Sequence, residues 1–143
     1  MCASINSEIK KIICEHSKNK VIESRAFTSW LGNDRICYTV VKPNANVQLE
    51  DALENTCSIK EISGNNIYPI LVNLKEINSI SKEARNHFSM QNHTPGVSAI
   101  AMLIKSPVSC IIGNIFLGFN KPVVPTQLFT RERAALSWLK QFT

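Results

Sequence analysis

The spacing of apolar and polar residues first indicates a β-hairpin. Residues 25–31 are rich in strand-forming side chains, and residues 32–34 (Gly-Asn-Asp) are typical of a tight turn. Ile36, Tyr38 and Val40 then occupy alternate positions of a second run. A period of two is that of a strand with one buried face, so this pattern predicts a pair of antiparallel strands.

Beyond the hairpin, the pattern alternates between short apolar runs and helical spacing. Leu49, Ala52, Leu53 and Thr56 share one helical face, so we predict a helix that begins near Gln48. Gly64 is a suitable end for it. By the same criteria, the chain is expected to continue with strand 68–74, helix 81–88 capped by Ser81, loop 91–96, strand 97–104, helix 107–119, strand 126–129 and a final helix capped by Thr130.

The predicted order of elements is β-β-α-β-α-β-α-β-α. Strands that alternate with helices form crossovers and a mainly parallel sheet, so we expect an α/β fold in one domain at residues 20–143. Residues 1–19 carry four isoleucines with helical spacing. They are expected to form an N-terminal extension with a short helix.

Composition and charge narrow the functional classes. Hydrophobic residues make up 44% of the 143 residues and charged residues 19%, which indicates a folded globular protein. The net charge is +5, but the basic residues are dispersed and form no stripe with aromatic side chains. We therefore do not expect nucleic-acid binding.

Membrane insertion is not expected either. Lys105 is the only charged residue between Val97 and Phe119, a length that could span a bilayer. However, Ser106-Pro107 in the middle of this stretch is a helix-start signal, which predicts a strand followed by a new helix.

The cysteine pattern favours a reducing compartment. The five cysteines, at positions 2, 14, 37, 57 and 110, include no CxxC pair, and the N-terminus does not resemble a signal peptide. We expect reduced thiols and a cytoplasmic protein. Cys37 and Cys110 lie in apolar runs and are expected to behave as small core residues.

No catalytic or metal-binding pattern can be recognised. The chain lacks a GxGxxG motif, a Walker loop, a GxSxG motif and an HExxH motif. His87 and His93 flank one predicted loop without a clear third ligand, and His16 lies far away in sequence. A pairing of Cys110 with His93 would place the thiol in an apolar helix, where it is inert. We therefore expect no catalytic residue, no metal, no cofactor and no enzymatic activity.

The start of the helix at Ser81-Lys82 is a candidate contact for an anion or a partner. It follows a predicted buried strand, and the N-terminus of a helix offers free N–H groups and the positive end of the helix dipole. Ligands also gather at the carboxyl ends of strands in α/β sheets.

The segment Val72–Ala84 resembles the signature of the STAS superfamily, the SpoIIAA-like anti-sigma-factor antagonists. In that family an apolar strand ending in Leu-Asp-Leu precedes a loop and an Asp-Ser-Ser-Gly sequence that opens a helix. Here Asn73 matches the first Asp, and the sequence Ser81-Lys82-Glu83-Ala84 matches Asp-Ser-Ser-Gly. Lys82 thus replaces the phospho-acceptor serine, which argues against the family's phosphorylation switch. Ser81, the neighbouring residue, is the hydroxyl that could be modified in its place.

The C-terminal half extends the resemblance. Residues 106–122 and 124–129, followed by an acidic residue and the sequence Ala-Leu-Ser-Trp-Leu at 135–139, are similar to short, stand-alone, uncharacterised bacterial STAS-like proteins. The resemblance covers about residues 20–143. It implies a SpoIIAA-like sheet with helices packed on one side, and a partner-binding or ligand-binding role without catalysis.

The predicted helix 107–119 is apolar on more than one face and must be covered on both sides. It is either buried within its own domain, or its outer face meets a second subunit or an apolar ligand. Gly113 and Gly118 would allow another backbone to approach closely. The candidate interface or pocket residues are Val108, Ile112, Ile115, Phe116 and Phe119.

Two functional hypotheses follow. The first is a non-enzymatic interaction or regulatory module that forms a homodimer or binds a regulatory protein. It predicts a flat surface on helix 107–119 that another chain covers. The alternative is a carrier or sensor of a small apolar or lipid-like ligand, as in SEC14-type relatives. It predicts an enclosed apolar pocket beside the same helix.

Overall fold

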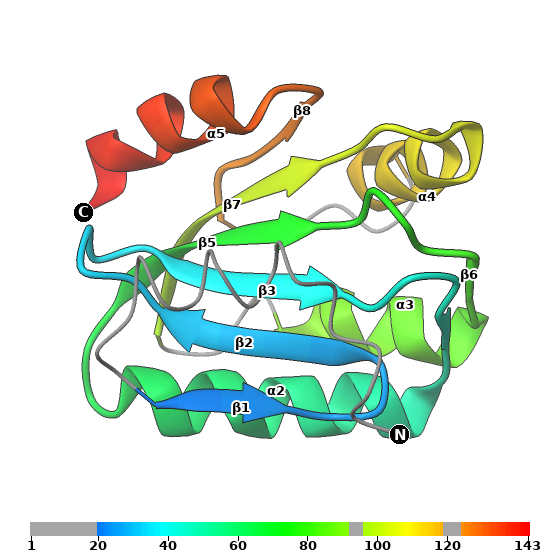
Figure 1. The fold of residues 1–143 in the computed structure, drawn as a ribbon, viewed down its shortest axis with the longest axis horizontal. Helices are drawn as coiled ribbons and strands as arrows, with labels where there is room; N and C mark the ends of the chain where they lie inside the picture. The colour runs from blue at the N-terminus through cyan, green and yellow to red at the C-terminus, as the bar shows by residue number, and fades with distance from the viewer. Residues whose placement is uncertain (1–19, 92–95, 119–123) are drawn as a thin grey trace.

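The computed structural model describes residues 20–91, 96–118 and 124–143 and centres on a six-stranded mixed sheet (Figure 1). The strand order is β1-β2-β3-β5-β7-β8. The first three strands are antiparallel, and the pairs from β3 to β8 are parallel. The strands are β1 (Val21–Glu23), β2 (Phe27–Leu31), β3 (Cys37–Val41), β5 (Tyr68–Asn73), β7 (Val97–Leu103) and β8 (Thr126–Phe129).

The predicted α/β fold and its order of main elements are confirmed. The structure adds three very short strands, namely β1 at the sheet edge and the parallel pair β4 (Asn46–Val47) and β6 (Ser79–Ile80). Strands of two or three residues carry no readable period, so the sequence pattern does not reveal them. The helix predicted within residues 1–19 and most of the loop predicted at 91–96 lie outside the described residues.

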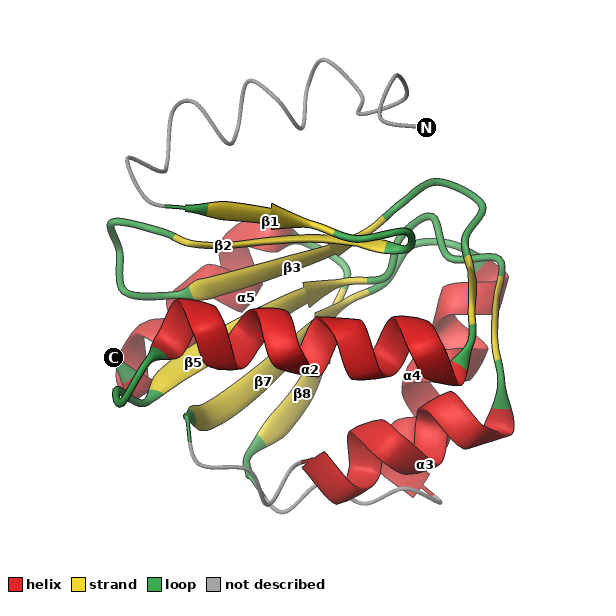
Figure 2. Ribbon diagram, turned by 90° about the horizontal axis from the view of Figure 1, so that it is seen from below, coloured by secondary structure: helices red, strands yellow, loops and turns green. Residues whose placement is uncertain are grey.

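Helices cover both faces of the sheet (Figure 2). The helices are α2 (Leu49–Ser63), α3 (Lys82–Gln91), α4 (Pro107–Gly118), α5 (Glu132–Leu139) and the short 3-10 helix η2 (Lys140–Phe142). The first three pack on one face and α5 packs on the other. The expectation that helices pack on one side is therefore wrong for α5. Crossovers between parallel strands place α2, α3 and α4 together, whereas α5 follows the last strand and is free of that constraint.

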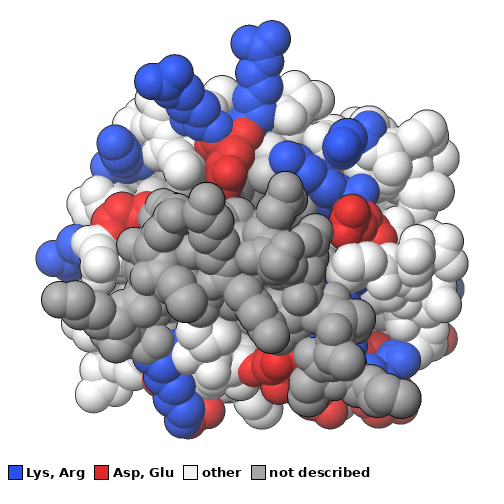
Figure 3. Space-filling model, in the orientation of Figure 1, with Lys and Arg blue, Asp and Glu red and all other residues white. Residues whose placement is uncertain are grey.

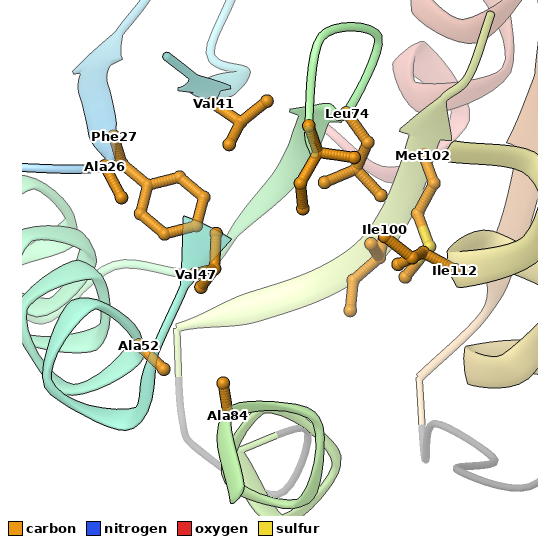
Figure 4. Close-up of a cluster of buried hydrophobic side chains, with 11 residues drawn as sticks. Ala26, Phe27, Val41, Val47, Ala52, Leu74, Ala84, Ile100, Met102 and Ile112 are labelled. Atoms are coloured by element: carbon orange, nitrogen blue, oxygen red, sulfur yellow. The ribbon is translucent and has the colours of Figure 1, made fainter. Parts of the chain in front are cut away.

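Two apolar cores result, one on each face. Between the sheet and α2, α3 and α4 lie the residues shown in Figure 4, among them Phe27, Ile100 and Met102. On the other face, Leu71 and Leu103 pack against Ala135 and Leu139 of α5. The central strands β5 and β7 thus alternate between two buried faces, which explains why they read as continuous apolar runs.

The N-terminus of α2 is fixed by a buried carboxylate. The backbone N–H of Gln48 donates to Asp51 Oδ2 over 2.8 Å, and Arg25 Nε donates to Asp51 Oδ1 over 2.9 Å. Asp51 is almost fully buried. One side chain therefore joins the helix start to the loop between β1 and β2, with an ion pair that strengthens the hydrogen bonds.

Hydroxyl groups cap the starts of α3 and α4. The N–H of Ala84 donates to Ser81 Oγ over 3.1 Å, so the predicted cap is confirmed. At α4, the N–H of Ser109 donates to Ser106 Oγ over 3.0 Å, and the N–H of Lys105 donates to Ser109 Oγ over 2.9 Å. These bonds satisfy amides that have no partner within the helix.

The cap predicted at Thr130 is wrong. The N-cap of α5 is Arg131, and it makes no side-chain capping bond. The carbonyl of Phe129 still accepts from the N–H of Ile104, so strand pairing extends to the residue before Thr130 and delays the helix.

This difference gives a direct test. Ser106→Ala should lower the free energy of unfolding by about 1 kcal/mol, because it removes a capping acceptor. Thr130→Ala, the matched control, should change it by less than about 0.5 kcal/mol. Urea denaturation followed by tryptophan fluorescence measures both. A larger loss for Thr130→Ala than for Ser106→Ala would contradict this assignment of the caps.

Candidate functional site

The structure brings the start of α3 close to α4, because β6 (Ser79–Ile80), which directly precedes Ser81, contacts α4. Ser81 Oγ is engaged in capping α3, and the Ser81 N–H donates to the Val47 carbonyl over 2.9 Å. Lys82 is exposed in the first turn of α3. The polar groups of Ser81 thus serve the local fold, and contact of Ser81 and Lys82 with an anion or a partner stays a prediction.

The residues predicted on helix 107–119 divide between a buried and an exposed face of α4. Ile112 is buried beside Ile100 and Met102 (Figure 4). Val108 is 39% exposed. Ile111, one helical turn further along the same helix, is 61% exposed. Ile115 is partly buried; the side chain of Phe116 and the whole of Phe119 lie outside the described residues.

Gly113 permits close packing within the chain itself. A Cβ atom at this position would lie 2.8 Å from Leu128 Cδ2 and 3.4 Å from Ile104 Cγ2. The close approach expected at Gly113 is thus made by side chains of the same chain and not by another backbone. The glycine allows α4 to settle on β7 and β8.

An apolar pocket of about 140 Å³ lies between the sheet and helices α2 and α3. Figure 4 shows part of its wall, with Phe27 on one side and Ile100 and Met102 on the other. We call it the α2–α3 pocket. It is lined by Phe27, Thr39, Asn55, Thr56, Ile59, Lys60, Ser63, Gly64, Ile70, Val72, Leu74, Ile77, Ile80, Phe88, Val97, Ile100 and Met102.

The position of the pocket differs from the position predicted from the sequence. The carrier hypothesis predicted a pocket beside helix 107–119, yet none of the described α4 residues lines the one observed. The reason is the spacing of the helices. Because α2 packs over β2 and β3, and Gly113 lets α4 pack closely on Leu128 of β8, the part of the sheet face between these two helices is left partly open. Val72 keeps partial exposure there although β5 is a central strand.

The inward face of α2 also differs from the predicted one. Leu49 and Leu53 are exposed, whereas Ala52, Asn55 and Ser63 are buried. Four of the five buried residues of α2 are polar, namely Asp51, Asn55, Ser58 and Ser63. A search for apolar periodicity cannot find this face, because polar residues on it break the pattern.

A buried polar cluster accounts for the position of Asn55. Asn55 Oδ1 lies 3.0 Å from Thr39 Oγ1 and 3.2 Å from Ser29 Oγ, and the two hydroxyl oxygens also lie within hydrogen-bonding distance of each other, so their two protons are shared among the three oxygens. All three side chains are buried. The hydrogen bonds among these three oxygens offset part of the cost of burying the side chains.

The end of the pocket beside the C-terminus of α2 is more open and more polar than the opposite end. Lys60 and Gly64, at the C-terminal end of α2, are exposed, whereas Leu74 and Ile77 at the opposite end are buried. Ser63 lies at the open end; it is 4% exposed, and its hydroxyl has no hydrogen-bond partner among the described residues. The pocket is therefore apolar in its interior with a polar group near its mouth.

His87 borders this region through Thr56. His87 Nε2 lies 2.8 Å from Thr56 Oγ1, and the Thr56 hydroxyl donates to the Ala52 carbonyl over 3.1 Å. Nε2 therefore acts as the donor to Thr56. Partial burial, and then the nearby positive charge of Lys60, lower the pKa of His87.

Among the described residues, the remaining reactive groups do not converge. Cys37 is fully buried, which confirms it as a small core residue, and this burial raises the pKa of its thiol to about 12. Cys110 is only partly buried, and Cys57 is exposed on α2. No three His, Cys, Asp or Glu side chains within residues 20–91, 96–118 and 124–143 are arranged to hold a metal ion.

The surface charge is dispersed. Figure 3 shows Lys and Arg side chains at separate places on one face, with acidic residues between them. Lys42 Nζ lies 2.7 Å from Glu23 Oε1, and Lys20 pairs with Glu61. Across the described part of the chain, no helix is both long enough and apolar enough to cross a bilayer.

Comparisons with known proteins agree with this architecture. A family model described as "Domain of unknown function (DUF7793)" matches residues 29–143. A crystal structure of an uncharacterised DUF3478-family protein from Shewanella loihica PV-4, with a SpoIIAA-like fold, is 14% identical, with a TM-score of 0.54 over 85% of this chain and 91% of that one. At this identity the likeness concerns the fold alone, and it confirms the SpoIIAA-like fold that the sequence indicated.

A second solved structure, a protein of unknown function from Arthrobacter sp. FB24, is 28% identical. The alignment covers 82% of this chain and 95% of that one, with a TM-score of 0.33. No curated protein matches the sequence.

Proposed function

Since the chain belongs to the DUF7793 family, whose function is unknown, we propose from its structure that it is a non-enzymatic module that binds a small apolar molecule in the α2–α3 pocket. The observation that carries the proposal is the pocket itself. Its walls are mostly apolar side chains from the sheet and two helices, and its mouth lies beside the C-terminal end of α2.

The size of the pocket limits the ligand. Sites for drug-sized molecules usually measure about 300–1,000 Å³, whereas an engineered apolar cavity of about 150 Å³ holds one benzene molecule. At about 140 Å³, the pocket suits a compound with one ring or a short branched chain. This volume favours a small molecule over the lipid that the sequence also suggested.

The chemistry of the wall supports binding without catalysis. The polar groups that line the pocket are hydroxyls, one carboxamide and the ammonium group of Lys60. Among the described residues, no carboxylate, thiol or imidazole lines it. General acid–base catalysis draws mostly on such titratable groups, so the lining suits recognition of a molecule better than its conversion.

A blocked pocket provides the test. Toluene at about ten times its dissociation constant should raise the melting temperature of the wild type by about 3–6 °C, as expected from ligand linkage. Val72→Phe should abolish this shift, because the larger side chain extends into the pocket. Differential scanning calorimetry measures both.

Val40→Phe is the matched control. Val40 is also partly buried, but it packs in the core on the opposite face of the sheet. This variant should keep the toluene shift whatever its own melting temperature. No shift in the wild type, or equal shifts in all three proteins, would contradict the proposal.

A second candidate function is the interaction module, and the outer face of α4 favours it. Val108 and Ile111 are large apolar side chains that stay exposed next to each other in one turn of this helix. Burial of such residues against a second copy of the chain would remove apolar surface from water. The occupant proposed here is that second copy, so the protein would be a homodimer; a regulatory partner would use the same face.

Ile111→Glu tests this second candidate, with Leu53→Glu as the control. Leu53 is an exposed apolar residue of similar size on α2. We expect a dimer mass for the wild type and for Leu53→Glu, and a monomer mass for Ile111→Glu, in size-exclusion chromatography with light scattering. A monomeric wild type at high concentration, or a dimeric Ile111→Glu, would exclude this interface.

A further inference from the structure

We propose that the occupant of the α2–α3 pocket carries a neutral hydroxyl group, and that Ser63 recognises it by a hydrogen bond; this inference rests on the proposed function. The ligand class is then a small phenol or alcohol with an apolar body. The proposal follows from one buried hydroxyl that the fold leaves without a partner.

Ser63 differs from the other hydroxyl residues of its helix. Within α2, Thr56 donates to the carbonyl of Ala52 over 3.1 Å, and Ser58 donates to the carbonyl of Glu54 over 2.9 Å. Both follow the usual pattern in which a helical hydroxyl bonds to the carbonyl four residues earlier. Ser63 Oγ makes no hydrogen bond with any described residue, although it is buried.

Two other buried polar side chains of the pocket wall already have hydrogen-bond partners. Thr39 Oγ1 and Asn55 Oδ1 bond to each other, and Asn55 Oδ1 also bonds to Ser29. A buried polar atom without a partner is rare in folded proteins and needs an explanation. Because Ser63 lines the pocket, a group on a bound molecule can supply the missing hydrogen bond.

The position of Ser63 sets the orientation of the ligand. Exposed Lys60 and Gly64 mark the mouth beside Ser63, whereas the far end is closed by Leu74 and Ile77. A ligand with its polar group at Ser63 would place its apolar body among the lining side chains at this end of the pocket, such as Ile59, Ile70 and Val97.

The same position favours a neutral group over an anion. Ser63 is the last residue of α2, and the C-terminus of a helix carries partial negative charge that disfavours anions. The Lys60 ammonium is exposed, so solvent screens its attraction for an anion. A hydroxyl group fits, since it can both donate to and accept from Ser63 Oγ.

Toluene and phenol make a matched pair of probes, because they have the same shape and differ by a methyl and a hydroxyl group. Their dissociation constants are measured by NMR titration for the wild type, Ser63→Ala and Ser58→Ala. Ser63→Ala should weaken phenol binding about threefold to tenfold, the usual effect of one lost hydrogen bond. It should change the dissociation constant of toluene by less than about twofold. Ser58→Ala should change the dissociation constant of neither phenol nor toluene.

Ser63→Ala is expected to fold, because it removes a hydroxyl that has no described partner. Ser63→Thr, which restores a hydroxyl, should regain the preference for phenol that Ser63→Ala loses. Benzoate should bind the wild type more weakly than phenol.

The outcomes separate the two proposals. If toluene binds the wild type but the phenol-to-toluene ratio is the same in Ser63→Ala, the pocket function stands and the role of Ser63 is overturned. Benzoate binding tighter than phenol also overturns the neutral class. If neither toluene nor phenol binds the wild type, the proposed function itself fails.

Discussion

The buried hydrogen bonds among Ser29, Thr39 and Asn55 fix the position of α2 on the sheet, and much of the architecture depends on that position. These groups lie under the helix, where an unpaired polar atom would cost about 1–3 kcal/mol. A rotation of α2 towards its more apolar side would bury Leu53 but separate Asn55 from both hydroxyls. Asp51 adds a second constraint at the helix start, through Gln48 and Arg25. The helix is thus held over β2 and β3 at both the middle and the N-terminal end.

The pocket is a consequence of this placement. Helix α2 packs on one side of the sheet face, and α4 packs on β8, where Gly113 contacts Leu128. Helix α3 packs against α2 and covers the space between them. It does so with Ala84 and with Phe88, whose ring meets Phe27 edge-on at 6.2 Å. The central strands keep apolar side chains beneath this cover, and Val72 stays partly exposed. Interiors are normally packed without such voids, so a lined space with a polar mouth is suited to a ligand.

The sequence pattern predicted those features of the fold that depend on residues close together in the chain. The bounds of α2, β5, β8 and the cap at Ser81 follow from periodicity, apolar runs and capping chemistry, and the structure agrees with them to within about one or two residues. The resemblance in Val72–Ala84 pointed to the correct fold. The inward face of α2, the placement of α5 on the second face and the pocket depend on contacts between distant segments. Asn55 and Ser63 look like surface residues in the sequence, because their partners or surroundings come from other elements.

The most direct test of this account is diffraction from crystals of the protein held under xenon pressure. Xenon enters apolar cavities of this size and gives a strong anomalous signal. The account predicts a xenon site inside the α2–α3 pocket, against lining side chains such as Ile100 and Met102. Density in which these side chains close the space and leave no xenon there would contradict it.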